Sequence, residues 1–185
     1  MRQEEFLSIL SVAEKLKCNT RHSDTSSRRR ESVAEHSWRL ALMAMLLEDE
    51  FSNVDINKVI KMCLIHDLGE AFTGDIATFN KTSKDSEREE EAYHNWIETF
   101  PEPQKEQFEE LLNEMSELKT EEAKLYKALD KLEAVIQHNE ADIRSWLPLE
   151  YDLQLTYGAD EVKYSQYLSG LKEYIDKWTK EKIRK

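Results

Sequence analysis

The sequence predicts an all-α protein. Apolar residues recur at the three- and four-residue spacing of helices with one buried face, and polar capping residues precede several of these runs. We find no segment with the alternating pattern of a half-buried strand. A chain of 185 residues can bury a sizeable hydrophobic core. We therefore expect a single domain over residues 1–185, built from roughly seven or more helices.

The first half of the chain divides into helices expected at residues 6–16, 32–50 and 56–68. The segment 17–31 is rich in Ser, Thr, Asn and Asp, so it is predicted to be a loop. Ser32 and Glu35 have the spacing of a capping box, which begins the second helix. That helix is apolar on most sides and is expected to be central. Asp55 can cap the third helix.

The second half is predicted to contain further helices at residues 85–100, 101–117, 121–139 and 160–183. The segment 69–84 before them is predicted to be looped. Pro101 and Pro103 suit the start of a helix, because proline fits the first turn. Thr120 can cap the next helix. A less regular stretch precedes the last one.

Composition excludes several classes of partner. The net charge of -12 makes the chain a poor candidate for binding polymeric DNA or RNA through phosphates. The N-terminal residues lack the pattern of a signal peptide, and no apolar run is long enough to suggest a membrane span. Cys18 and Cys63 are far apart and form no paired motif. We expect a cytoplasmic protein with reduced thiols and no membrane partner.

Four residues on or beside the predicted helices form a candidate metal-binding set: His36, His66, Asp67 and Asp130. All have apolar neighbours, so we expect them close to the core. Two imidazoles and two carboxylates suit Mn, Co, Ni, Zn or Fe better than Ca, and the set lacks the thiolates of a structural zinc site. His66 and Asp67 are adjacent, so both can reach one ion only if the helix ends there, which Gly69 favours.

The spacing alone leaves a second interpretation open. A single histidine in a helical pattern is more often packed or exposed than a metal ligand, and we assign His94 and His138 to such roles. Asp130 by itself could lie at the edge of a helix face. A helical scaffold or binding module with incidental histidines and aspartates is therefore an alternative.

Three segments resemble the HD-domain metal phosphohydrolases: SVAEHSWRL at 32–40, LIHDLGEAFTGDI at 64–76 and KALDKLEAV at 127–135. The combination of E-H-S, H-D-x-x-E and T-G-D is more specific than a His-Asp pair, and it is most similar to the 5'-deoxynucleotidase branch. The resemblance runs from about residue 6 to residue 140. It implies an HD-domain helical bundle around a buried metal site, with a core at about 30–140 and a helix at about 160–183 packed on it.

The resemblance also implies roles for the candidate residues. His36, His66, Asp67 and Asp130 match the ligands of one divalent ion, which would be Mn, Co or another transition metal, with Mg and Zn as alternatives. Glu70 matches the catalytic acid of the family. A carboxylate just outside the ligands can orient or deprotonate the attacking water.

Substrate-binding residues follow from the same resemblance. Asp75, Ile76, Ala77 and Thr78 match the segment that contacts the nucleoside sugar.

Arg21 matches the arginine that contacts phosphate, and its guanidinium group can bind phosphate oxygens bidentately. The branch has Trp directly after this arginine, whereas this chain has His22, which can hydrogen-bond or carry charge instead. We include His22 among the expected substrate-binding residues.

Together these matches imply a metal-dependent phosphomonoesterase that hydrolyses (deoxy)nucleoside 5'-monophosphates, and a homodimer. Another HD phosphohydrolase acting on a nucleotide polyphosphate, a cyclic nucleotide or an alarmone is the alternative within this class. A two-iron oxygenase is disfavoured, because it needs extra histidine ligands between Asp67 and Asp130, where only His94 lies.

Overall fold

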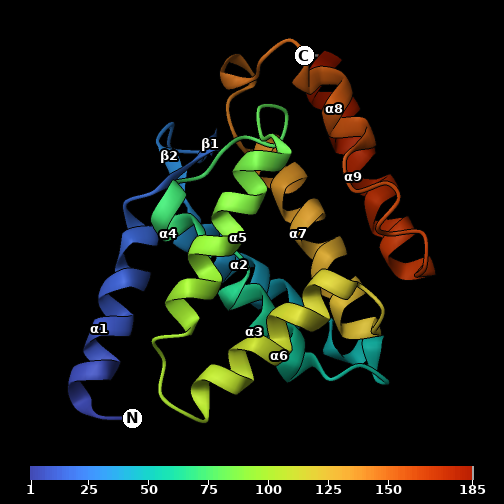
Figure 1. Cartoon of the computed structure of the whole chain (residues 1–185). Coiled ribbons are helices and arrows are strands. Elements are labelled where there is room, and N and C mark those ends of the chain that lie inside the picture. Colours follow the sequence, from blue (N-terminus) through green and yellow to red (C-terminus); the bar gives the residue numbers. More distant parts are fainter. Residues whose placement is uncertain (185) are drawn as a thin grey trace.

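The computed structural model describes residues 1–184 and confirms the helical class. Three helices form its centre: α2 (Val33–Leu46), α3 (Ile56–Ile65) and α7 (Glu121–Glu140). Each of the three packs against the other two. Figure 1 shows them behind α5 and α6, with α1 and α9 on opposite sides.

The remaining helices surround this centre. They are α1 (Gln3–Ala13), α4 (Glu70–Thr73), α5 (Ser83–Ile97), α6 (Gln104–Glu117), α8 (Glu150–Thr156) and α9 (Gln166–Arg184), with the 3-10 helices η1 (Glu14–Lys17), η2 (Glu48–Phe51) and η3 (Ile143–Ser145). Helix α9 packs on both α7 and α8. Within residues 1–184, no helix combines the length and apolarity that crossing a membrane requires.

The predicted caps start the central helices. The Ser32 hydroxyl accepts a hydrogen bond from the Glu35 amide at 3.2 Å, and the Glu35 carboxylate accepts one from the Ser32 amide at 2.9 Å. The side chains of Asp55 and Thr120 accept bonds from the amides three residues later, at 3.1 and 3.2 Å. Each such cap stabilises its helix by about 1 kcal/mol.

The predicted loop at 17–31 is wrong, because most of it forms an antiparallel hairpin. Strand β1 (Thr20–Asp24) pairs with β2 (Arg30–Ser32), and the register shifts once between them. The strands carry few apolar residues, so no alternating pattern marks them. Contacts outside the hairpin help to hold it, since the Gln137 side chain of α7 donates to the Asp24 carbonyl at 2.6 Å.

The C-terminal expectation also needs correction. The last helix begins at Gln166 rather than near residue 160, and the irregular stretch before it contains α8. Helix α8 buries two polar side chains, Glu150 and Gln154. Because the buried face of α8 is polar, the sequence shows no apolar periodicity that would predict this helix.

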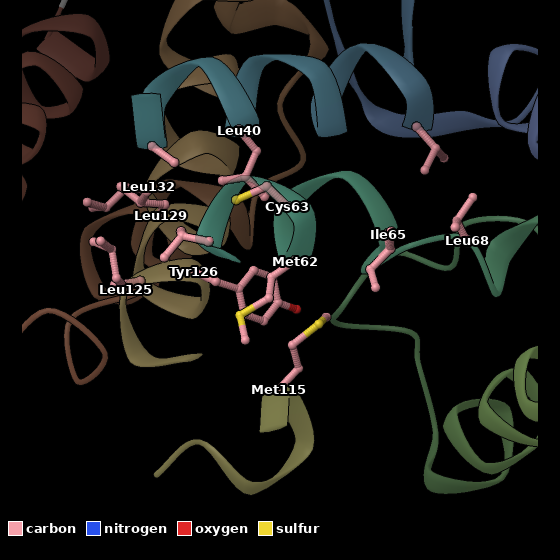
Figure 2. Close-up of a cluster of buried hydrophobic side chains, with 14 of the residues drawn as sticks. Leu40, Met62, Cys63, Ile65, Leu68, Met115, Leu125, Tyr126, Leu129 and Leu132 are labelled. Atoms are coloured by element: carbon pink, nitrogen blue, oxygen red, sulfur yellow. The ribbon is translucent and has the colours of Figure 1, made fainter. Parts of the chain in front are cut away.

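The hydrophobic core lies where the three central helices meet. Figure 2 shows Leu40 of α2, Met62 and Cys63 of α3, and Tyr126 and Leu129 of α7 gathered in one cluster. Four of these side chains are completely buried, and Tyr126 nearly so. Burying one large apolar side chain contributes about 1.5–3 kcal/mol. This packing fixes the relative positions of the polar residues that the same helices carry.

Candidate metal centre and cleft

The structure brings together the four predicted metal ligands, which we call the His–Asp quartet: His36, His66, Asp67 and Asp130. The Nε2 atom of His66 lies 3.0 Å from Asp67 Oδ2 and 3.8 Å from Asp130 Oδ1. The Nε2 atom of His36 lies 3.3 Å from Asp130 Oδ1 and 3.9 Å from Asp67 Oδ2. Ligands at about 2.0–2.2 Å from one ion lie roughly 3 Å or slightly more apart, so the spacing fits a shared ion.

The four residues of the quartet come from three parts of the centre. His36 lies in the first turn of α2, and Asp130 lies midway along α7. Helix α3 ends at Ile65, so His66 caps it and Asp67 follows in the turn. Because the helix stops there, two adjacent side chains can face the same point.

Gly69 permits this turn by allowing a close approach. A Cβ atom at Gly69 would lie 3.1 Å from the Glu89 Cγ and 3.3 Å from the Tyr93 Cβ, both on α5. Its backbone is right-handed, with φ at -59°, so it is not the left-handed helix cap that the sequence suggests. The glycine is required by packing rather than by backbone conformation.

Hydrogen bonds orient both histidine rings of the quartet. His36 Nδ1 bonds to the Glu133 carboxylate, and His66 Nδ1 donates to the Cys63 carbonyl at 2.9 Å. Within residues 1–184, neither ring's Nε2 atom has a hydrogen-bond partner, although both atoms are buried. Buried polar atoms normally have a partner. A metal ion would satisfy both atoms, so the residues present fit a bound cation.

Charges around the quartet keep its carboxylates ionised. Burial alone would favour the protonated forms. Lys127 and His36 nevertheless lower the pKa of Asp130, and the nearby histidines and Arg21 hold the pKa of Asp67 well below its usual range. Lys127 Nζ is 3.0 Å from Asp130 Oδ2, which leaves Oδ1 facing the imidazoles.

His36 holds a proton that a cation must displace. Burial and Arg21 disfavour a charged imidazole, but Glu133 and Asp130 outweigh them and raise the pKa of His36 to about 9. A metal ion takes the place of a proton at Nε2, so binding releases that proton and strengthens as pH rises.

Glu70 lies in the first turn of α4 and is only 4% exposed. Its Oε2 atom is buried without a hydrogen bond to any described residue. Burial, and then the charges of Asp67 and Asp75, raise its pKa to about 10. At neutral pH the cation-free site therefore holds a protonated carboxyl group beside the quartet. A divalent ion there would favour its ionised form.

A small, open cleft of about 70 Å³ adjoins the quartet. Its wall includes Arg21 and His22 of β1 and Asp75, Ala77 and Thr78 of the segment after α4. Arg21 also contacts the quartet, since its Nη1 lies 3.3 Å from Asp67 Oδ2.

Most of the expected substrate-binding residues thus lie together, with one exception. Ile76 is half-buried and does not line the cleft, although both of its chain neighbours do. His94 lies on α5 with its side chain 44% exposed, near Glu90.

The structure adds three residues to the site and its cleft that the sequence does not single out: Glu133, His138 and Glu150. Glu133 lies one helical turn after Asp130, so its spacing could have revealed it. The sequence predicts a packed or exposed role for His138, whereas the structure places it in the wall of the cleft, at the end of α7. Glu150 is 1% exposed and also lines the cleft, and nothing in its irregular segment signals that position.

The sequence is similar to a known protein family and to several curated proteins. Residues 13–172 match the family model described as HD domain. The 5'-deoxynucleotidase HDDC2 of Mus musculus is 38% identical over 112 residues, which cover 60% of this chain and 55% of that protein. The 5'-deoxynucleotidase hdd1 of Schizosaccharomyces pombe is 32% identical over 113 residues, covering 58% of this chain and 56% of that protein. The chain thus spans about half the length of the curated relatives it matches.

A solved structure extends the similarity to nearly the whole chain. A predicted metal-dependent phosphohydrolase from Magnetospirillum magnetotacticum MS-1 superposes with a TM-score of 0.81 at 28% identity. The match covers 98% of this chain and 94% of that one.

Proposed function

Because this chain belongs to the HD domain family, we propose that it is a metal-dependent phosphohydrolase that hydrolyses (deoxy)nucleoside 5'-monophosphates to nucleoside and phosphate. One observation carries this proposal. The buried Nε2 atoms of His36 and His66 lack hydrogen-bond partners among the described residues and face the carboxylates of Asp67 and Asp130 beside the cleft. The names of the curated relatives support the substrate class.

The His–Asp quartet would hold one divalent ion. Its mixed nitrogen and oxygen donors suit Mn, Co or another transition metal. When bound, such an ion lowers the pKa of a coordinated water and polarises a phosphoryl oxygen. Glu133 fixes the tautomer and orientation of His36 for this purpose, as carboxylates commonly do behind a metal-bound histidine.

Arg21 would bind the phosphate. Its guanidinium group lies at the junction of quartet and cleft, held by Asp67 at 3.3 Å and by Glu31 at 3.4 Å. These carboxylates restrict its side chain to one geometry, which reduces the ordering needed when a phosphate binds. A bidentate contact would offset the phosphate charge during hydrolysis.

Glu70 would move the proton. A divalent ion in the quartet would favour the ionised form of Glu70, and the carboxylate could then accept a proton from the attacking water. The same group can then return that proton to the 5'-oxygen of the departing nucleoside. This role needs a position near the quartet but outside it, which the start of α4 provides.

The nucleoside would lie in the cleft. Asp75 can accept a hydrogen bond from a sugar hydroxyl, and Thr78 lies beside it in the wall. The Thr78 hydroxyl is 3.2 Å from the Tyr157 hydroxyl, which also accepts from Lys131 at 2.9 Å. These bonds stiffen the wall, and a stiff wall that fits a deoxyribose would exclude the extra 2'-hydroxyl.

We also propose that the protein is a cytoplasmic homodimer. Trp38, Met45 and Leu46 of α2 are 62%, 53% and 71% exposed, which supports a self-association surface. Cys18 and Cys63 are free thiols in the structure, consistent with a reducing compartment. Light scattering of the purified protein would test the dimer, and a monomer mass would contradict it.

A substrate panel tests the activity. Chelated protein is reconstituted with Mn²⁺ or Co²⁺ and supplied with ribo- and deoxyribonucleoside 5'-monophosphates, and released phosphate is measured. We expect release only with metal, and faster release from deoxyribonucleotides. His66→Ala should abolish it, whereas the exposed His94→Ala should not. Absence of release from every substrate with either metal would favour the scaffold alternative.

A further inference from the structure

A second group of titratable side chains lies in the wall of the cleft. The cleft-wall cluster consists of His22 of β1, His138 of α7 and Glu150 of α8, and none of the three belongs to the His–Asp quartet. One Glu150 oxygen, Oε1, lies 3.0 Å from His138 Nε2 and 3.2 Å from His22 Nε2. Glu150 is 1% exposed, and the side chains of His138 and His22 are 13% and 25% exposed.

In this cluster, with neutral rings, the Nε2 atoms and the Glu150 oxygen that can accept a hydrogen bond outnumber the N–H groups available to donate one. His138 Nδ1 is 2.9 Å from the Ala134 carbonyl, which can only accept, so the ring proton lies on Nδ1. His138 Nε2 also lies within hydrogen-bond distance of the Glu150 carboxylate, at 3.0 Å; when the ring is neutral with its proton on Nδ1, a lone pair faces that oxygen and a cation between the two would satisfy both. His22 Nε2 is buried and has no hydrogen-bond partner among residues 1–184. With the His22 ring proton on Nδ1 as well, three electron-pair donors converge, and a shared cation would satisfy all three.

The three side chains are held in place before anything binds. The other Glu150 oxygen accepts a hydrogen bond from the Leu147 amide at 2.6 Å, which leaves Oε1 directed at the imidazoles. The His22 ring packs edge-on against Phe79, with centroids 5.3 Å apart. The His138 ring packs in the same way against Trp146, at 6.0 Å. A metal site needs this kind of preorganisation.

We propose that His22, His138 and Glu150 form a second divalent-cation site, separate from the quartet, that binds an ion of the Zn²⁺, Co²⁺ or Ni²⁺ class. Two imidazoles and one carboxylate suit these ions. The separations of 3.0 and 3.2 Å match neighbouring ligands of one ion. Three protein ligands leave positions open toward the cleft for water or for a donor atom of a bound molecule.

The proposal also gives a reason for His22. The resemblance places tryptophan at this position, and an indole has no lone pair with which to bind a cation. With neutral imidazoles the cluster carries one negative charge, so a divalent ion would make it net positive. The ion would thus add positive charge to the same cleft that Arg21 lines.

Ion stoichiometry tests the proposal and does not depend on phosphatase activity. Chelated protein is brought to equilibrium with Co²⁺ or Zn²⁺ by dialysis, and bound metal is counted by elemental analysis. We expect two ions per chain for the wild type and for the surface control His94→Ala. His22→Trp and His138→Gln should each bind one. The Co²⁺ visible spectrum should lose one component in these variants, while circular dichroism confirms that they remain folded.

Two results would overturn the second site. One is a wild-type stoichiometry of a single ion that His66→Ala removes, which would mean that a proton bridges the cluster instead. The other is an unchanged count in both His22→Trp and His138→Gln. Two bound ions without phosphate release would support the second site while contradicting the proposed activity, so the two failures are distinguishable.

Discussion

The His–Asp quartet and the cleft-wall cluster use the same kinds of side chain on different supports. The quartet is carried by α2, α7 and the end of α3, the helices that form the hydrophobic core. The cleft-wall cluster is carried by a hairpin strand, the last part of α7 and the short helix α8. The difference indicates that the core fixes one site, whereas the second depends on segments that polar contacts hold in place.

The largest effect is expected from Asp67→Ala, which should disable the quartet and leave the cleft-wall cluster intact. Asp67→Ala should remove metal-dependent phosphate release down to the level of chelated protein, because it deletes a ligand and the partner of Arg21. The ion bound by the cleft-wall cluster should remain. Phosphate assays and elemental analysis of the same sample measure both. Retained turnover would rule out the quartet as the catalytic centre.

Glu133→Gln tests how strongly one hydrogen bond behind a ligand matters. Glu133 is fully buried between His36 and Arg39, with Arg39 Nε at 2.6 Å. Removing its charge should weaken metal affinity or activity by about 10–100-fold. The matched control is Glu140→Gln, which alters the exposed partner of the same Arg39 at 2.5 Å. Equal effects of the two substitutions would contradict the positioning role.

The raised pKa of Glu70 predicts that the stability of the chelated protein depends on pH. Its folded pKa of about 10 lies above the ordinary value of 4.5, so the folded state holds a proton that the unfolded state has released. The free energy of unfolding should therefore fall as pH rises from 5 toward 9. Urea titrations of Glu70→Gln should show a smaller fall than the wild type or Glu91→Gln, which alters an exposed carboxylate of α5. Identical pH slopes would contradict the buried, protonated carboxyl.

The smallest effect concerns the turn that ends α3. Gly69→Ala places a methyl group 3.1 Å from the Glu89 side chain, so it should lower the free energy of unfolding by about 1–3 kcal/mol. Gly170→Ala is the control, since nothing among the described residues outside its own stretch of helix would lie within 4 Å of an added Cβ, and alanine favours a helix. Thermal unfolding should shift downward for Gly69→Ala and slightly upward for Gly170→Ala. A shift in the same direction for both would remove the close-approach argument.

The two regions also differ in how far the sequence predicted them. The central helices could be located because apolar periodicity and caps such as Ser32 and Asp55 are local signals. The quartet followed because its members lie in recognisable segments of those helices. Glu133 lies three residues after Asp130 and could have been found from helical spacing.

The hairpin and α8 could not be predicted in the same way. Their buried residues include polar groups such as Ser23, Glu150 and Gln154, whose partners are distant in sequence or lie in irregular segments. Helix α8 brings Glu150 to His22 of β1, more than a hundred residues earlier in the chain. No local pattern in the sequence encodes that contact.

The two lysines beside Asp130 bear on what would happen if the quartet lost a bound ion. Lys127 and Lys131 lie 3.0 and 3.6 Å from the Asp130 carboxylate, and Arg21 lies 3.3 Å from Asp67. Each acidic ligand thus retains a cationic neighbour in the absence of metal, so chelation does not leave a buried charge uncompensated. We therefore expect the fold to outlast the removal of a bound ion, so that different metals could be exchanged into one preparation without refolding the protein.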